Sequence, residues 1–179
     1  MQRIFATEER IKLLEAIIFR TDLISVNAVA GQLKLSKGLV SKYFDILVRT
    51  GILKRRNGKL SVADSPVTRS VKILLNMTRI PPKIFKKYPF VKSAGLYGSC
   101  ARGENTEDSD IDMWVMVRET KDHLLASLTS ELNKKVSNVK VLFLTNKKIK
   151  ELKKQDALFY HALAFGSIIL YGDKDAIQL

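Results

Sequence analysis

The sequence has little of what would build a secreted or membrane protein. It contains a single cysteine, Cys100, which cannot form an internal disulfide and leaves no cysteine-based zinc framework. No apolar run approaches the roughly 20 residues needed to cross a bilayer. The first residues, MQRIFATEER, lack the basic-then-apolar order of a signal peptide. We therefore expect a soluble, cytoplasmic protein without membrane contact.

Positive charge is concentrated in the first half of the chain. The formal net charge is +13, from 31 Lys and Arg against 18 Asp and Glu. Residues 1–64 carry 12 basic and 6 acidic side chains, residues 65–90 carry 6 and none, and residues 91–179 carry 13 and 12. The first 90 residues thus hold +12 of the +13, which indicates a polyanionic partner for that half. The alternative is charge that serves solubility or heat adaptation.

Three helices are predicted before residue 51. Thr7, Ser25 and Ser36 are suited to N-caps, and apolar residues follow each of them at helical spacing. The first helix is expected to end near Thr21, and Gly51 is a natural stop for the third. The apolar positions of the third helix, which we expect to face the core, are Leu39, Val40, Phe44, Leu47 and Val48.

A short hairpin is predicted directly after these helices. The segments ILKRR and KLSV alternate with period two and flank Asn57-Gly58, a pair typical of type I′ turns because both residues need positive φ. Three short helices and a basic hairpin resemble the winged helix-turn-helix regulators of bacteria and archaea. This resemblance covers about residues 1–64 and rests on the pattern alone.

A winged helix of this kind implies contacts to double-stranded DNA. Its third helix enters the major groove, and its wing meets phosphates. The residues expected at the groove are Ser36, Lys37, Ser41 and Lys42, and those expected at the phosphates are Lys54, Arg55, Arg56 and Lys59. Palindromic operators would favour a homodimer. The alternative use of such a fold is dimerisation or docking of another protein.

Residues 65–82 are interpreted as a basic linking helix. Apolar residues between Pro66 and Ile80 recur at helical spacing, and Pro81-Pro82 ends the pattern. Its basic surface would either extend the DNA contact or be solvated. The run from Lys147 to Lys154, later in the chain, is interpreted as a solvated helical face.

The second half contains a pattern suited to a nucleotide and a metal ion. The segment VKSAGLYG predicts a strand that leads into a turn at Gly98, where the backbone can approach a ligand. Ser99 would begin a short helix, whose free N–H groups and dipole favour an anion. Asp110 and Asp112 alternate with apolar residues as in a half-buried strand, so both carboxylates project from one face. Such paired carboxylates suit Mg²⁺ or Mn²⁺ bound together with substrate phosphates.

These residues resemble the minimal nucleotidyltransferases of the DNA polymerase β superfamily. Gly98-Ser99, ten residues, and Asp110-x-Asp112 match their GSx10DxD signature, and the likeness extends to the closing IILYG. It implies a mixed α/β (α+β) chain: a winged helix-turn-helix at 1–64, a linking helix at 65–82, and a nucleotidyltransferase domain at 83–179 with a small mixed sheet flanked by helices.

The resemblance also implies roles for particular residues. Gly98 and Ser99 would hold the phosphates of ATP or another NTP, while Asp110 and Asp112 would hold the metal. Arg102 is a candidate phosphate contact, and a salt bridge to Glu104 or Glu107 is the alternative. Active members usually carry a third carboxylate on the next strand, where this sequence has Lys140.

Two functions remain open from the sequence. The first is an enzyme that transfers a nucleoside monophosphate, AMP above all, to a hydroxyl; in the resembled family the acceptor can be a tyrosine of a HEPN-type toxin, which makes the enzyme an antitoxin. The second is a transcription regulator whose inactive nucleotidyltransferase-like domain senses nucleotide or binds a partner. Lys140 favours the second, and the intact signature favours the first. Cys100, Tyr160 and His161 are interpreted as structural or packing residues.

Overall fold

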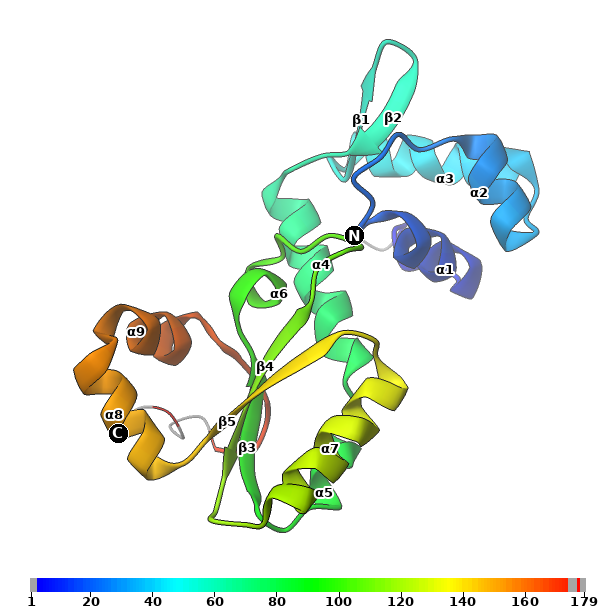
Figure 1. Cartoon of the computed structure of the whole chain (residues 1–179). Coiled ribbons are helices and arrows are strands. Elements are labelled where there is room, and N and C mark those ends of the chain that lie inside the picture. Colours follow the sequence, from blue (N-terminus) through cyan, green and yellow to red (C-terminus); the bar gives the residue numbers. More distant parts are fainter. Residues whose placement is uncertain (1–2, 174–176, 178–179) are drawn as a thin grey trace. The chain divides into compact units, whose positions relative to one another are not determined.

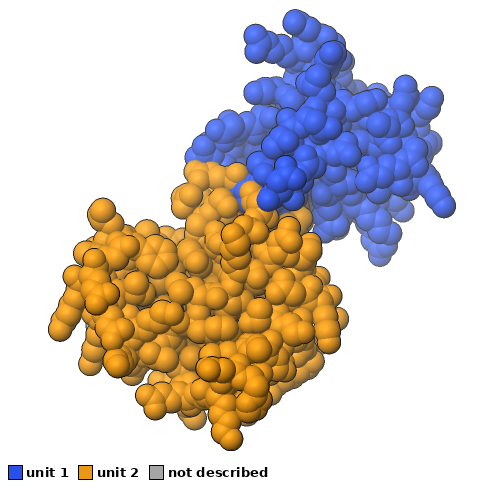
Figure 2. Space-filling view, in the orientation of Figure 1, with its two compact units in different colours: residues 1–72, 105–108 blue, residues 73–104, 109–179 orange. Residues whose placement is uncertain are grey.

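The computed structural model describes residues 3–173 and 177, which divide into two compact units (Figure 2). The first unit comprises Met1–Lys72 with Asn105–Asp108, and the second comprises Ile73–Glu104 with Ser109–Leu179. The division falls within helix α4 (Pro66–Arg79), the segment that the sequence predicts as a linking helix. Among residues 3–173, no helix is both long and apolar enough to cross a bilayer.

The first unit contains three helices followed by a hairpin (Figure 1). The helices are α1 (Glu8–Ile17), α2 (Val26–Leu33) and α3 (Lys37–Arg49). The three predicted N-caps are confirmed, because the side chains of Thr7, Ser25 and Ser36 accept hydrogen bonds from Arg10, Ala28 and Leu39. Helix α1 ends four residues before the predicted Thr21.

One predicted core position of α3 is wrong. Leu39 is 38% exposed, whereas Tyr43 is buried between Val40 and Leu47 along the helix. The Tyr43 hydroxyl donates a hydrogen bond to the carbonyl of Ile4 at 3.0 Å. Because its hydroxyl has a hydrogen-bond partner inside the unit, Tyr43 can be buried, although hydrophobicity alone favoured Leu39 as the core residue.

The predicted turn of the hairpin is confirmed. Strands β1 (Leu53–Arg56) and β2 (Lys59–Val62) pair antiparallel. Asn57 and Gly58 join them with φ of 53° and 74°, the positive values of a type I′ turn.

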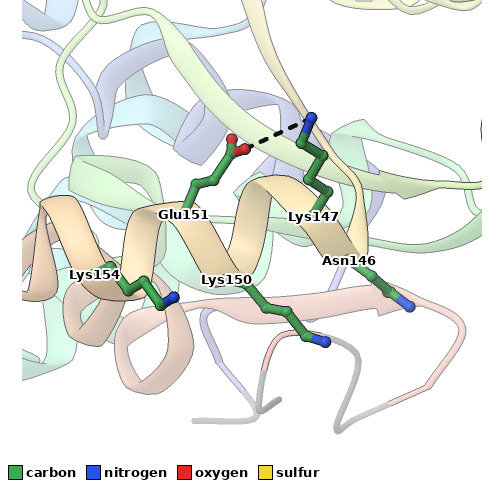
Figure 3. A pocket seen from close by; sticks show the side chains of 5 residues that line it. All are labelled: Asn146, Lys147, Lys150, Glu151 and Lys154. Atoms are coloured by element: carbon green, nitrogen blue, oxygen red, sulfur yellow. Dashed lines mark ion pairs between the residues drawn. The ribbon is translucent and has the colours of Figure 1, made fainter.

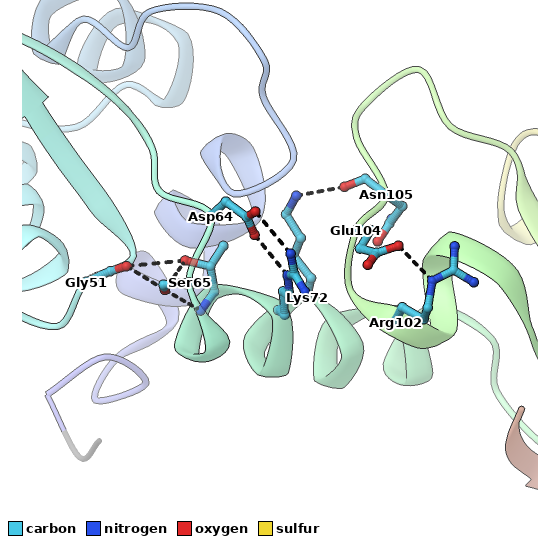
Figure 4. A network of polar contacts seen from close by, with 9 residues as sticks. Gly51, Asp64, Ser65, Lys72, Arg102, Glu104 and Asn105 are labelled. Atoms are coloured by element: carbon cyan, nitrogen blue, oxygen red, sulfur yellow. Dashed lines mark hydrogen bonds and ion pairs between the residues drawn. The ribbon is translucent and has the colours of Figure 1, made fainter. Parts of the chain in front are cut away.

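Lys72 on α4 corrects the expectation of a solvated basic surface. It is 8% exposed, and its Nζ donates a 2.7 Å hydrogen bond to the carbonyl of Asn105 (Figure 4). The same Nζ lies 5.7 Å from the centre of the Phe19 ring, and burial lowers the pKa of Lys72. The segment 105–108, which lies between the two halves of the GSx10DxD pattern, thus belongs to the first unit.

The second unit contains a four-stranded mixed sheet, as expected from the fold class. In chain order its elements are α5 (Lys83–Lys86), β3 (Val91–Leu96), α6 (Gly98–Arg102), β4 (Ile111–Val117), α7 (Asp122–Lys135), β5 (Val139–Leu144), α8 (Asn146–Gln155), α9 (Ala157–Gly166) and β6 (Ile168–Tyr171). The strand order is β5-β4-β3-β6. Strands β4 and β5 are parallel, and the other two pairs are antiparallel.

Helices cover both faces of this sheet (Figure 1). On one face, Met113 and Val115 of β4 pack in a core that includes residues of α5 and α7. On the other face, Trp114 and Met116 pack with residues of α8 and α9. The expectation that β4 is half-buried is therefore wrong, and only the Asp112 position near its start is partly open.

Candidate active site

Gly98 brings the backbone directly against a carboxylate. It follows β3 with a φ of 65°, which L side chains rarely adopt. A Cβ added there would lie 2.9 Å from Oδ2 of Asp112. The place therefore requires glycine for its conformation and for its space.

Ser99 is half-buried in the first turn of the short helix α6. Among the described residues, no side chain caps the start of α6. Its first N–H groups are therefore not occupied by a side-chain cap, as a phosphate-binding turn requires. Gly103 closes the helix in a left-handed conformation, and the N–H of Glu104 donates to the carbonyl of Ser99 at 2.9 Å.

Asp110 directly precedes β4 and Asp112 is the second residue of that strand, and both are held through their backbone. The carbonyl of Asp112 accepts the N–H of Tyr97 at 3.1 Å, and the Cys100 thiol donates to the carbonyl of Asp110 at 3.5 Å. Burial raises the pKa of Asp112, and the negative charge of Asp110 adds to this rise. Asp110 thus lies close enough for its charge to disfavour the ionised form of Asp112.

Lys140 lies beside these carboxylates. It faces Asp112 in the parallel register of β4 and β5. Its Nζ lies 2.5 Å from Oδ2 of Asp110 although its side chain is 67% exposed. The hydrogen bond to Asp110 raises the pKa of Lys140, so the ammonium form is favoured. One oxygen of Asp110 is therefore engaged by a cation of the chain itself.

Arg102 takes up the alternative contact that the sequence offers. Its Nε lies 2.7 Å from Oε2 of Glu104, and its side chain is 59% exposed (Figure 4). Its role as a phosphate contact stays a prediction, since an exposed pair of this kind is weak enough to exchange for a phosphate.

The family model described as "Polymerase beta, Nucleotidyltransferase" matches residues 82–175, more than half of the chain. The chain belongs to this family. The matched residues contain the whole arrangement of Gly98, Ser99, Asp110 and Asp112.

Two curated proteins of Methanocaldococcus jannaschii are similar to this polymerase β nucleotidyltransferase. "Putative protein adenylyltransferase MJ1215" is 41% identical over 59 residues, which are 33% of this chain and 69% of that protein. "Putative protein adenylyltransferase MJ0128" is 41% identical over 56 residues, 31% of this chain and 57% of that protein. The matched residues thus span 69% of the first relative and 57% of the second.

The solved structure "Crystal structure of the toxin-antitoxin with AMP-PNP" superposes only loosely on this chain. It is 18% identical, with a TM-score of 0.41, over 57% of this chain and 78% of that chain. A likeness this loose carries no functional argument.

Nucleotidyltransferases act on nucleoside triphosphates with a divalent metal ion, and the carboxylates of this site fit that ion. Asp110 and Asp112 offer hard oxygen ligands on one face, and the close approach of Gly98 keeps one wall of the site free of a side chain. Among the described residues, no group of three or more His, Cys, Asp or Glu could hold a metal. Bound metal would therefore take its other ligands from the triphosphate and water, and it would compete with Lys140 for Oδ2 of Asp110.

All eight residues predicted to contact DNA are exposed in the first unit. Ser36, Lys37, Ser41 and Lys42 lie at the N-cap and in the first turns of α3, and Lys54, Arg55, Arg56 and Lys59 lie on the hairpin. The Ser36 hydroxyl already accepts the N–H of Leu39, and Arg55 pairs with Asp45 at 3.2 Å. DNA contact by these residues stays a prediction.

Tyr97 is a residue of the site that sequence reasoning missed. Its N–H holds the backbone of Asp112, and its ring lies 6.0 Å from the ring of Phe159 on α9. Burial, and then the charge of Asp112, raise the pKa of Tyr97. The sequence signal that could have identified Tyr97 is its position directly before Gly98. Cys100 is fully buried and burial raises its pKa, which fits the predicted structural role.

Proposed function

We propose that this protein transfers AMP from ATP to a hydroxyl group. The observation that carries the proposal is the pair of carboxylates of Asp110 and Asp112 next to Gly98. A Cβ on residue 98 would fill the space beside the Asp112 carboxylate. Membership of the nucleotidyltransferase family supports transfer of a nucleotide. The two relatives both carry the name "Putative protein adenylyltransferase", which supports ATP as the nucleotide and a protein as the acceptor.

The site residues have separate tasks in this reaction. Backbone N–H groups at Gly98 and Ser99 bind the phosphates, and Asp110 and Asp112 hold Mg²⁺ or Mn²⁺. When bound, the metal neutralises triphosphate charge and orients the attacking hydroxyl. The hydroxyl oxygen bonds to the α-phosphorus as the bond to pyrophosphate breaks, and the hydroxyl proton passes to solvent or a carboxylate. Arg102 would turn from Glu104 to the phosphates.

The acceptor we propose is a tyrosine of a HEPN-type toxin. The resemblance of the sequence to minimal nucleotidyltransferases supports this choice, and it would make the chain an antitoxin of the cytoplasm.

The first unit is proposed to be a winged helix-turn-helix that binds double-stranded DNA as a homodimer. The order of three helices and a hairpin supports it, as does the exposure of Lys37, Lys42, Lys54 and Arg56. Binding to its own promoter would couple the amount of antitoxin to transcription.

One observation favours a second function, a nucleotide sensor without transfer activity. The ammonium of Lys140 engages Asp110, so the chain carries its own counter-ion where a metal would bind. A nucleotide could then bind the turn at Gly98 while the metal needed for transfer is held poorly.

Labelled ATP separates the two functions. The full chain is incubated with ATP labelled at the α-phosphate, Mg²⁺ and an extract that contains a HEPN-type toxin, alongside Asp110→Asn and Asp112→Asn. Transfer predicts a labelled protein band that both variants lose and that Asp108→Asn, an exposed carboxylate outside the pair, retains. Binding of ATP by equilibrium dialysis without any labelled band would replace the enzyme with the sensor.

A further inference from the structure

Helix α9 presents an apolar stripe to solvent. Leu158 is 86% exposed and Phe165 is 75% exposed, seven residues or two helical turns apart. His161 and Ala162 lie exposed between them on the same side. Single exposed apolar residues are ordinary, but two this open on one stripe are typical of an interaction surface.

The opposite side of α9 already has its place in the fold. Tyr160 and Leu163 are buried against the sheet with Trp114. The stripe is therefore not needed to hold the helix in the second unit. His161, predicted as a packing residue, instead stacks its exposed ring on Phe165, with ring centres 5.7 Å apart and planes at 10°.

The neighbouring helix α8 is strongly basic. Its sequence NKKIKELKKQ contains five lysines and one glutamate. Asn146, Lys147, Lys150, Glu151 and Lys154 line a hollow of about 390 Å³ along one side of the helix (Figure 3). Oε1 of Glu151 lies 4.0 Å from Nζ of Lys147. With three lysines against one glutamate, the lining of the hollow has a net positive charge.

A chain of contacts joins the basic helix to the apolar stripe. Lys153 follows Lys150 by three residues, which places it on the adjoining side of α8. Its Nζ lies 5.5 Å from the centre of the Tyr160 ring. The Tyr160 ring lies 5.3 Å from that of His161, which in turn stacks on Phe165. The Tyr160 ring is itself buried, but it contacts exposed side chains of both helices, which lie next to each other in the fold. We define the α8/α9 surface by the exposed lysines and stripe residues of these two helices: Lys147, Lys150, Lys153, Lys154, Leu158, His161 and Phe165.

We propose that the α8/α9 surface binds an acidic, amphipathic helix of a partner protein. The two-turn separation of Leu158 and Phe165 matches the spacing at which another helix repeats its apolar residues. Carboxylates on the flank of that helix meet the lysines of α8, which supplies charge complementarity. The inference is independent of the reaction proposed for Asp110 and Asp112.

A designed peptide tests the surface directly. The probe is a fluorescein-labelled 18-residue helix with leucine on one stripe and glutamate elsewhere. Its controls are a scrambled peptide of the same composition and a peptide with lysine for glutamate. The full chain is expected to bind the probe with a micromolar Kd by fluorescence anisotropy, and more weakly as salt is raised. It should bind the scrambled peptide at least tenfold more weakly, and the lysine peptide not at all.

Variants assign the binding to this surface. The double variant Leu158→Ser/Phe165→Ser should weaken binding at least tenfold, and Lys150→Glu/Lys154→Glu about tenfold at low salt. Matched controls are Leu23→Ser, a 55% exposed apolar residue of the first unit, and Lys134→Glu/Lys135→Glu on α7. Both controls should bind as the parent does. Asp112→Asn should also bind normally, so a failed transfer reaction and a failed surface are distinguishable.

Three results would overturn the proposal. Equal binding of the scrambled peptide, or no binding by the parent, removes the acidic helix as the occupant. The third result comes from sedimentation. If the chain sediments as a dimer that Leu158→Ser/Phe165→Ser disrupts and Leu23→Ser does not, the stripe binds a second copy of the chain instead.

Discussion

The two units use their basic side chains in opposite ways. On the hairpin of the first unit, Lys54, Arg56 and Lys59 are exposed, while their neighbour Arg55 pairs with Asp45. In the active site of the second unit, Lys140 and Arg102 pair with acidic groups of the chain itself. The comparison teaches that the hairpin cations are open to the proposed polyanion, whereas in the proposed reaction a metal and a triphosphate would compete with ion pairs internal to the second unit.

Two glycines, one in each unit, differ in the same way. Gly58 in the hairpin and Gly98 in the site have positive φ of 74° and 65°. A Cβ at Gly58 would meet nothing within 4 Å, whereas one at Gly98 would meet the Asp112 carboxylate. The same substitution therefore has the same backbone cost at both places but a steric cost only in the site.

Of the two glycine substitutions, Gly98→Ala is expected to have the larger effect, a strong loss of AMP transfer. The added methyl group displaces the Asp112 carboxylate or the turn, and a displacement of about 1 Å in an active site can cost roughly a hundredfold in rate. Initial rates of labelled AMP transfer measure the effect.

Gly58→Ala is the matched control for this prediction. Each variant should lose about 1 kcal/mol of stability from the left-handed conformation, but Gly58→Ala should transfer AMP at the parental rate. Equal activity of the two variants would contradict the proposed role of the turn at Gly98.

The hairpin should govern DNA affinity with an effect of intermediate size. Lys54→Ala/Arg56→Ala removes two predicted phosphate contacts, which weakens binding about 30-fold at 0.15 M salt and lowers the salt slope by about two. Fluorescence anisotropy with duplex DNA over a range of salt concentrations measures both. Lys92→Ala/Lys121→Ala, which removes two exposed lysines of the second unit, should leave the affinity and the slope unchanged.

Local features of the fold could be predicted from the sequence. The N-caps at Thr7, Ser25 and Ser36 and the turn at Asn57-Gly58 depend on a few neighbouring residues, whose backbone preferences are visible in the letters. The glycine of the site could be identified for a related reason, because the GSx10DxD pattern is itself local.

Features that depend on distant partners could not be predicted in the same way. Lys72 is buried because it bonds to Asn105, 33 residues further along the chain. Strand β4 is buried on both faces because helices from two later parts of the chain cover it, and alternation within seven residues cannot reveal that. The pair of Lys140 and Asp110 likewise follows from the parallel pairing of β4 with β5.

Lys140→Met should change the affinity of the second unit for a divalent metal ion by a few-fold. The substitution keeps most of the apolar stem but removes the ammonium that competes for Asp110, so Mn²⁺ should bind about fivefold more tightly. Isothermal titration with Mn²⁺ in the absence of nucleotide measures this affinity. Lys92→Met is the control, and an unchanged affinity in Lys140→Met would show that the ion pair does not compete with metal.

The effect of Asp112→Asn on stability should be the smallest of the effects predicted here, and it is a gain. Burial and the charge of Asp110 raise the pKa of Asp112 above its usual 3.8, so the folded chain holds the proton more tightly than the unfolded chain does. The stability that this proton contributes is complete below the unfolded pKa and is lost as the pH rises through the folded one. At pH 7 the ionised carboxylate is therefore a cost, which asparagine removes.

Thermal unfolding measures this gain. We expect Asp112→Asn to raise Tm by about 1–2 °C at pH 7, and the difference from the parent to vanish as the pH falls below the pKa of Asp112. Asp108→Asn, with its exposed carboxylate, should leave Tm equal to that of the parent at pH 7 and at a pH below the pKa of Asp112. A variant that loses AMP transfer and gains stability would show that Asp112 is kept for chemistry at the expense of the fold. A lower Tm for Asp112→Asn at pH 7 would instead mean that its contact with the turn at Gly98 stabilises the fold.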